Sequence, residues 1–127
     1  SFSGRNVAVL GAAFKPDSDD VRDSPALDIA AAIFNAGASV RVHDPKAMGN
    51  AAARFPNLAY AQSVEDAVTG ADVVLHLTEW REYRELDPAQ LRALVRQPHI
   101  IDGRLCLDVQ KWRDAGWTYE ALGRPNI

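Results

Sequence analysis

The sequence predicts an α/β fold: a doubly wound, Rossmann-like domain with a mainly parallel sheet of about five to six strands and helices on both faces. Two observations support this prediction. Short apolar segments that end at Gly, Pro or Asp alternate along the chain with segments of helical periodicity. Helices also join the successive strands, and such crossovers make the strands parallel. The 127 residues contain no repeat or linker, so we expect a single domain over residues 1–127.

The first strand is expected at Val7–Leu10, an apolar run that stops at Gly11. It shows no alternation of polarity, which is typical of a strand buried on both faces. A charged loop follows, and Ser24 can then cap a helix that begins with Pro25, where the missing N–H costs nothing. Helical spacing gives this helix one apolar side, made by Ala26, Ile29, Ala30 and Ile33.

The later elements follow the same alternation. A second strand at Ser39–His43 is stopped by Asp44-Pro45, because proline cannot continue a strand ladder. The other expected elements are a helix over 46–55, a short strand over 58–60, a helix from 63 to 69–70, a strand over 72–78, a helix from 87 that ends before 98, a strand over 99–101, a helix over 109–115 and a last strand over 117–122.

Composition argues against several classes of function. A net charge of −3 argues against broad binding to nucleic acid, and no apolar run approaches the length needed to span a bilayer. The single cysteine, Cys106, suits a reducing compartment, so a cytoplasmic protein is expected. The sequence shows no metal-ligand spacing, and we predict no metal. Strand signals begin almost at once without an initiator Met, which suggests a piece excised from a longer polypeptide.

Unusual residues follow three of the predicted strands: Phe14-Lys15 with Arg22, then Thr78-Glu79-Trp80, then Asp102-Gly103-Arg104. Ligands of doubly wound sheets bind beyond the carboxyl ends of the strands. If these strands are neighbours, three cations gather on one rim, where they would suit a phosphate-bearing ligand. In the alternative interpretation, Lys15 and Arg22 only form surface ion pairs with the nearby Asp17, Asp19, Asp20 and Asp23.

Other candidates carry less specific signals. Gly11 is not followed by a G-x-G-x-x-G pattern, so the pyrophosphate fingerprint is absent, and Asp44 is better explained as a turn residue than as a ribose ligand. Cys106 has no local activator and is expected to be a small, partly buried thiol. His76, between two leucines, is expected in the core or an interface. Trp80 is a core residue or a contact to a ligand or another domain.

The chain contains several motifs in a fixed order: Gly11-x-x-Phe14-Lys15-x-x-x-x-Asp20-x-Arg22-x-Ser24-Pro25, His43-Asp44-Pro45, Thr78-Glu79-Trp80, Asp102-Gly103-Arg104, and a closing segment from Gly116 to Gly123-Arg124. Together they resemble the C-terminal, UDP-binding domain of the UDP-glucose/GDP-mannose dehydrogenase family, and most closely its UDP-glucose group. Leu105 departs from the family pattern, which usually has Asn or Arg there.

The resemblance implies a function. Members of this family oxidise the C6 alcohol of a nucleotide sugar to a carboxylate with NAD, which an N-terminal domain holds. It implies that Phe14, Lys15 and Arg104 contact the UDP-sugar, that Arg22 faces the NAD side, and that Asp20 and the 78–80 motif line the cleft. It also implies no catalytic residue in this chain, an N-terminal NAD domain of the same polypeptide as partner, and a homodimer or larger assembly.

Three hypotheses therefore remain open. The chain is the substrate-binding domain of such a dehydrogenase, acting on UDP-glucose or on GDP-mannose or UDP-N-acetylmannosamine. Alternatively it is a stand-alone nucleotide-binding module without activity. In the third, it is an unrelated doubly wound domain whose rim charges are solvated ion pairs.

Overall fold

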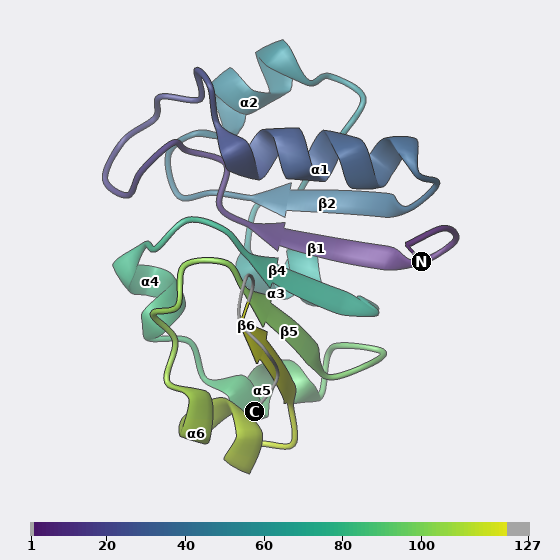
Figure 1. The fold of residues 1–127 in the computed structure, drawn as a ribbon, viewed down its shortest axis with the longest axis vertical. Helices are drawn as coiled ribbons and strands as arrows, with labels where there is room; N and C mark the ends of the chain where they lie inside the picture. Colours follow the sequence, from purple (N-terminus) through teal and green to yellow (C-terminus); the bar gives the residue numbers. More distant parts are fainter. Residues whose placement is uncertain (1, 122–127) are drawn as a thin grey trace.

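A computed structural model describes residues 2–121 and contains one six-stranded sheet with helices packed around it (Figure 1). The strands are β1 (Asn6–Leu10), β2 (Ser39–His43), β3 (Ala59–Tyr60), β4 (Val73–His76), β5 (His99–Asp102) and β6 (Thr118–Ala121). The helices are α1 (Pro25–Asn35), α2 (Met48–Arg54), α3 (Val64–Val68), α4 (Arg81–Arg84), α5 (Pro88–Arg92) and α6 (Val109–Asp114).

The strand order is β3-β2-β1-β4-β5-β6, and every pair of neighbours is parallel. This is the doubly wound order expected for a Rossmann-like fold, and it confirms the predicted fold class. The order reverses between β1 and β4, which makes that position the topological switch point. All carboxyl ends therefore lie at one edge of the sheet, where Figure 1 shows the long loop after β1 and the short helix α4.

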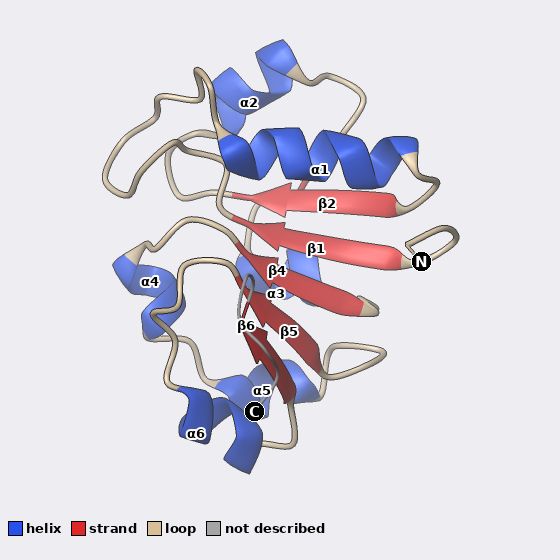
Figure 2. Cartoon of the chain, in the orientation of Figure 1, coloured by secondary structure: helices blue, strands red, loops and turns tan. Residues whose placement is uncertain are grey.

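The two directions of winding place helices on both faces of the sheet. Crossovers from β1 outward to β3 run one way, and those from β3 back to β4, β5 and β6 run the other way, so right-handed connections put α1 and α3 on opposite faces. Figure 2 shows α3 behind the strands. The central strand β4 is buried along its whole length. Within residues 2–121 no helix combines the length and apolar character needed to cross a membrane.

Local sequence signals explain where several helices begin. The hydroxyl of Ser24 accepts a hydrogen bond from the Leu27 amide and caps α1, with Pro25 in its first turn, as predicted. Asp87 caps α5 in the same way, again before a proline. Ser63 caps α3 and Asp108 caps α6. These capping residues satisfy amides that the helices themselves leave without partners.

Several boundaries of helices and strands differ from the predictions. Helix α2 begins at Met48 rather than at position 46, because the Asp44 carboxylate holds the Lys46 and Ala47 amides in a turn. Strand β4 ends at His76, and α5 ends at Arg92, before Leu94 and Val95. The one-turn helix α4 was not predicted. The predicted end of the last strand at Leu122, and the Gly123-Arg124 motif, lie outside the described residues.

Candidate functional site

The three loops that carry the predicted site residues meet at the carboxyl edge of the sheet. They follow β1, β4 and β5, which are neighbours in the sheet, so the condition for the predicted cations to gather on one rim is met. Gly11, with φ of +112°, is where two of these loops come closest. A Cβ there would lie 2.4 Å from Oγ1 of Thr78, so only glycine allows the contact.

The loop from Gly11 to Ser24 is held at both ends. The Phe14 amide donates to the Asp20 carbonyl (2.8 Å), which closes the segment between them. The Ser24 hydroxyl donates to the Ala12 carbonyl (2.8 Å), and the Thr78 hydroxyl donates to the Ala13 carbonyl (3.0 Å). The loop therefore reaches Phe14 and Lys15 through a fixed backbone, and both of these side chains are exposed.

Asp44, directly after β2, connects three of the loops through one buried carboxylate. Its Oδ2 accepts hydrogen bonds from the amides of Ala12 (2.8 Å) and Ala13 (3.0 Å) and from Nε1 of Trp80 (3.2 Å). Its Oδ1 accepts from the amides at the start of its own loop, which confirms Asp44 as a turn residue. Because the Asp44 carboxylate is 0% exposed and accepts hydrogen bonds at both oxygens, it cannot also bind a ribose.

Asp102, the last residue of β5, has a corresponding role in the next loop. Its Oδ1 accepts from the amides of Arg104 and Leu105, and its Oδ2 from those of Cys106 and Leu107, each at 3.0 Å. The backbone of the Arg104 loop is therefore wrapped around one carboxylate.

Two buried side chains complete the environment of the Asp102 carboxylate. Nδ1 of His76 donates to Oδ1 (2.8 Å), and the Tyr119 hydroxyl donates to Oδ2 (2.7 Å). Burial by itself would raise the pKa of Asp102, but hydrogen bonds from His76, the Leu107 amide and Tyr119 hold that pKa below its ordinary value. Burial, together with the bond to Asp102, raises the pKa of Tyr119. His76 is thus a core histidine, as one of its two predicted interpretations had it.

The predicted cations differ in their partners. Arg22 pairs with Asp20 (2.9 Å), as the alternative interpretation expected, and this hydrogen bond lowers the pKa of Asp20 to about 2. Arg104 pairs with Glu79 (2.9 Å), which joins the loops after β5 and β4. The Lys15 ammonium forms no ion pair or hydrogen bond with the part of the chain that the structure describes. The roles of all three toward a ligand stay predictions.

The residues predicted for the cleft are only partly accessible. Thr78 is buried and braces the loop after β1, and Trp80 is 4% exposed with its indole N–H bound to Asp44. Trp80 is therefore mainly a core residue. Both Glu79 and Trp80 nevertheless line an open pocket of about 630 Å³ at the carboxyl edge, together with Pro16, Asp17, Lys46, Arg81, Glu82 and Arg84.

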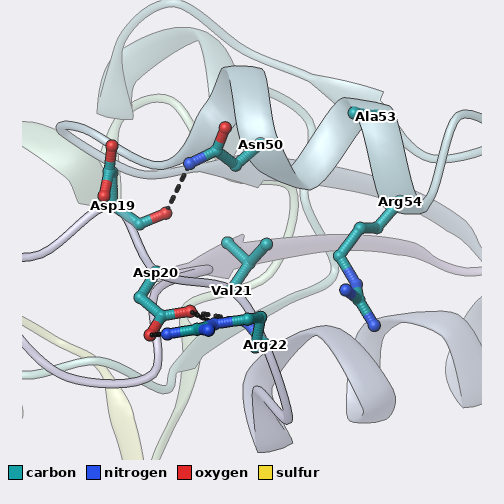
Figure 3. A pocket seen from close by; sticks show the side chains of 7 residues that line it. All are labelled: Asp19, Asp20, Val21, Arg22, Asn50, Ala53 and Arg54. Carbon is teal, nitrogen blue, oxygen red and sulfur yellow. Dashed lines mark hydrogen bonds and ion pairs between the residues drawn. The ribbon is translucent and has the colours of Figure 1, made fainter.

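A second pocket, of about 540 Å³, lies between the loop after β1 and helix α2 (Figure 3). Arg22 and Asp20 lie against each other on one side of it, and Arg54 extends toward it from α2. The amide of the Asn50 side chain donates to the Asp19 carbonyl (2.9 Å) and ties the loop to the helix. Phe14, which is 51% exposed, lines a smaller neighbouring pocket with Asp20, Arg22 and Asp23.

Cys106 lies close to His76 and Asp102, and the three side chains form a candidate group of metal ligands. Burial, and then the negative charges of Asp102 and Glu79, raise the pKa of Cys106 to about 11, which disfavours the thiolate that binds metal. Asp102 already accepts six hydrogen bonds, one of them from His76. The trio is arranged as a hydrogen-bonded network, and the thiol is partly buried, as expected.

Sequence reasoning did not find the roles of Asp44 and Asp102. Asp44 follows β2 and stands before a proline, and Asp102 ends β5 and stands before a glycine, which is a signal for a side-chain–backbone turn. That signal identifies the turn, but not the partners more than 20 residues away.

The strand order and the polar loops beyond the strands define this protein as a Rossmann-like domain with its candidate site at the switch point of the sheet. The model of the UDP-binding domain of the UDP-glucose/GDP-mannose dehydrogenase family matches residues 8–109, and the chain belongs to that family. The resemblance found in the motifs is thereby confirmed.

Curated relatives extend this match to the whole chain. UDP-glucose 6-dehydrogenase TuaD of Bacillus subtilis is 39% identical over 128 residues, which cover 100% of this chain and 28% of the relative. UDP-glucose 6-dehydrogenase AglM of Haloferax volcanii is 43% identical over 121 residues, 95% of this chain and 27% of the relative. The chain thus spans little more than a quarter of the length of these relatives.

Solved structures share the fold. A UDP-glucose dehydrogenase from Pyrobaculum islandicum superposes with a TM-score of 0.77 at 37% identity, over 94% of this chain and 25% of the other. An NDP-N-acetyl-D-galactosaminuronic acid dehydrogenase from Methanosarcina mazei superposes with a TM-score of 0.83 at 32% identity, over 97% of this chain and 25% of the other.

Proposed function

We propose that this chain binds the nucleotide part of a UDP-sugar, with Phe14, Lys15 and Arg104 as its contacts. The observation that carries the proposal is their placement. All three side chains are exposed on braced loops at the carboxyl edge, beside the switch point, in a domain whose family model is a UDP-binding domain. Lysine and arginine at this edge suit a diphosphate, and an exposed aromatic ring suits a base or sugar.

NAD is proposed to bind mainly to a further domain, with Arg22 at the side of this chain that faces it. The local geometry supports this division. In dinucleotide-binding domains the amides after the first strand hold the pyrophosphate. Here the amides of Ala12 and Ala13 donate to the Asp44 carboxylate instead, so they are not available to a phosphate. NAD would supply the hydride acceptor for the oxidation of the sugar alcohol.

In the whole protein, the proposed activity is the NAD-dependent oxidation of UDP-glucose to UDP-glucuronate. Residues 1–127 would form its single UDP-sugar domain, next to an N-terminal NAD domain, in a homodimer or larger assembly. The names of the curated relatives support UDP-glucose as the substrate. A different sugar is the second candidate, because a similar fold occurs in a dehydrogenase named for an N-acetylgalactosaminuronic acid. The single cysteine suits the reducing cytoplasm, where we place the protein.

Calorimetry of the chain with UDP, UDP-glucose and GDP-mannose tests the binding. We expect heat with UDP and UDP-glucose, and a loss of affinity of about tenfold for Lys15→Ala and for Arg104→Ala, since each removes one charge-assisted contact. Arg5→Ala is the matched control, because it removes the same charge before β1, at the opposite edge of the sheet, and should leave affinity unchanged.

Two outcomes would contradict the proposal. No heat with any of the three ligands at millimolar concentration would exclude both the substrate domain and the stand-alone module. Unchanged affinity in both site variants would leave only solvated ion pairs at the rim. A separate experiment tests the proposal that NAD binds mainly to a further domain. NAD and UDP-glucose added to this chain should produce no NADH, and appreciable NADH would contradict that proposal.

A further inference from the structure

Two buried aspartates lie directly under the loops that display the proposed UDP contacts. Asp44 and Asp102 are both 0% exposed, although a carboxylate is rarely buried so fully without compensation. Asp44 is compensated by backbone amides of its own loop and of the loop after β1, and Asp102 by amides of the loop that follows it. Side chains behind these loops also donate to both carboxylates. Such carboxylates act as internal anions that hold the backbone of a loop in one shape.

Asp44 controls the approach to Phe14 and Lys15. Two of the four amides it binds, those of Ala12 and Ala13, immediately precede Phe14. Its side-chain donor, the indole of Trp80, lies in the core behind the loop. Loss of the carboxylate would release the start of the segment that carries both side chains.

Asp102 controls Arg104 more directly. The first of the four amides it binds is that of Arg104 itself, and the next belongs to Leu105, which adopts a left-handed φ of +60°. That conformation is unfavourable for leucine and persists where its surroundings impose it. The hydrogen bonds from the 104–107 backbone to one carboxylate provide that constraint.

We propose that Asp44 and Asp102 are positioning residues for UDP binding: Asp44 acts through the Phe14-Lys15 loop, and Asp102 acts through Arg104. This inference rests on the proposed function, because it concerns the same contacts. It adds that the Phe14-Lys15 loop and the Arg104 loop are each held by a different buried aspartate, and that the two aspartates affect UDP affinity independently.

A set of double-mutant cycles tests the assignment. UDP affinity is measured by calorimetry for Asp44→Asn, Asp102→Asn, Lys15→Ala and Arg104→Ala and for the four combinations of one aspartate with one cation. Asparagine has the shape of aspartate but offers an NH₂ group toward amides that also donate, so it cannot accept the same set of bonds. We expect each Asp→Asn variant to weaken UDP binding about tenfold.

The pattern of coupling decides the question. Asp102→Asn should cost little further affinity in the Arg104→Ala background but its full effect in the Lys15→Ala background. Asp44→Asn should show the reverse pattern. Additive effects in all four combinations would indicate general destabilisation and would overturn the positioning roles.

The matched control is Asp72→Asn. Asp72 is another buried aspartate, 4% exposed, but it lies at the opposite edge of the sheet, where it accepts a hydrogen bond from the Asn6 amide (2.9 Å). Its variant should leave UDP affinity unchanged, even where it lowers stability. A loss of affinity equal to that of the other two aspartates would contradict the proposal.

Milder variants keep the test decisive if an Asp→Asn protein does not fold. Tyr119→Phe removes one donor to Asp102, and Trp80→Phe removes one donor to Asp44. Each should weaken UDP binding less, with the same pattern of coupling. If Lys15→Ala and Arg104→Ala leave affinity unchanged, the proposed function fails and this inference fails with it. If they weaken binding while the aspartate variants do not, only the positioning roles are wrong.

Discussion

Asp20 and Asp102 show how burial changes the structural role of an aspartate. Asp20 lies at the surface, and its low pKa comes from the hydrogen bond with Arg22, which solvent screens. Asp102 lies in the core, and six hydrogen bonds replace the water that it has lost. Removal of Asp20 should therefore affect stability little, whereas removal of Asp102 leaves buried donors unpaired.

Cys106 offers a prediction at the same scale. With its pKa raised to about 11, its thiolate at pH 8 should be about a hundredfold rarer than that of a thiol with the ordinary value of 9.0. Alkylation by iodoacetamide should therefore be slow at pH 8 in the folded protein and should accelerate up to about pH 11. The rate can be followed by mass spectrometry, with the urea-unfolded chain as the reference. Equal rates in the folded and unfolded chain would contradict the prediction.

At the scale of elements, the connection from β1 to α1 departs most from an ordinary dinucleotide-binding domain. There the helix follows the strand after a short glycine turn and directs its amino end at a phosphate. Here 14 residues, from Gly11 to Ser24, separate the two elements, and Ser24 and Pro25 occupy the start of α1. The loop thereby projects side chains rather than bare amides, which fits contacts made across a cleft.

A substitution at Gly11 tests how the loop between β1 and α1 packs against the loop after β4. Gly11→Ala should lower the free energy of unfolding by about 3 kcal/mol or more, because a Cβ would clash with Thr78 and φ is +112°. Gly49→Ala is the control within α2, where a Cβ meets nothing within 4 Å, and it should stabilise the protein by about 0.5 kcal/mol. Urea denaturation measures both. Equal stabilities for the two variants would show that the loops after β1 and β4 do not meet at Gly11.

For the whole molecule, the network around Asp102 links three neighbouring strands. His76 belongs to β4, Asp102 to β5 and Tyr119 to β6, so one carboxylate ties that half of the sheet together at its carboxyl edge. In the role proposed for Asp102, UDP binding and stability depend on the same buried group. The stability of the sheet at low pH therefore reports on the protonation of Asp102.

The pH dependence of stability follows from the lowered pKa of Asp102. A carboxyl whose pKa is lower in the folded state stabilises fully above its unfolded value of about 3.9, and this contribution is lost as the pH falls below that value. The difference in unfolding free energy between the protein and Asp102→Asn should therefore be constant from pH 7 to 5 and decrease below about pH 4. Urea denaturation across this range checks it, and a difference independent of pH would contradict it.

The fold class and the capped starts of α1, α3 and α5 could be predicted because their signals are local: an apolar run, or a capping residue within a few positions of the amide that it satisfies. The start of α2 was predicted two residues too early, although its cause is also local: Asp44 withdraws the amides of Lys46 and Ala47 from the helix. Helix α4 was missed because it has no side-chain cap; Tyr83 anchors it by donating to the His43 carbonyl, 40 residues away.

The same distinction applies to the candidate site. Phe14, Lys15 and Arg104 follow strand signals within a few residues, so the local pattern and the family motifs identify them. The contacts of Asp44 with Ala12 and Trp80 and the contact of Asp102 with His76 join residues that are 26 to 36 positions apart. The sequence does not show which charged or aromatic side chains become buried, because burial is set only when the sheet and its loops pack together. In the folded chain Asp44, Asp102 and Trp80 are buried and hold the loops by hydrogen bonds.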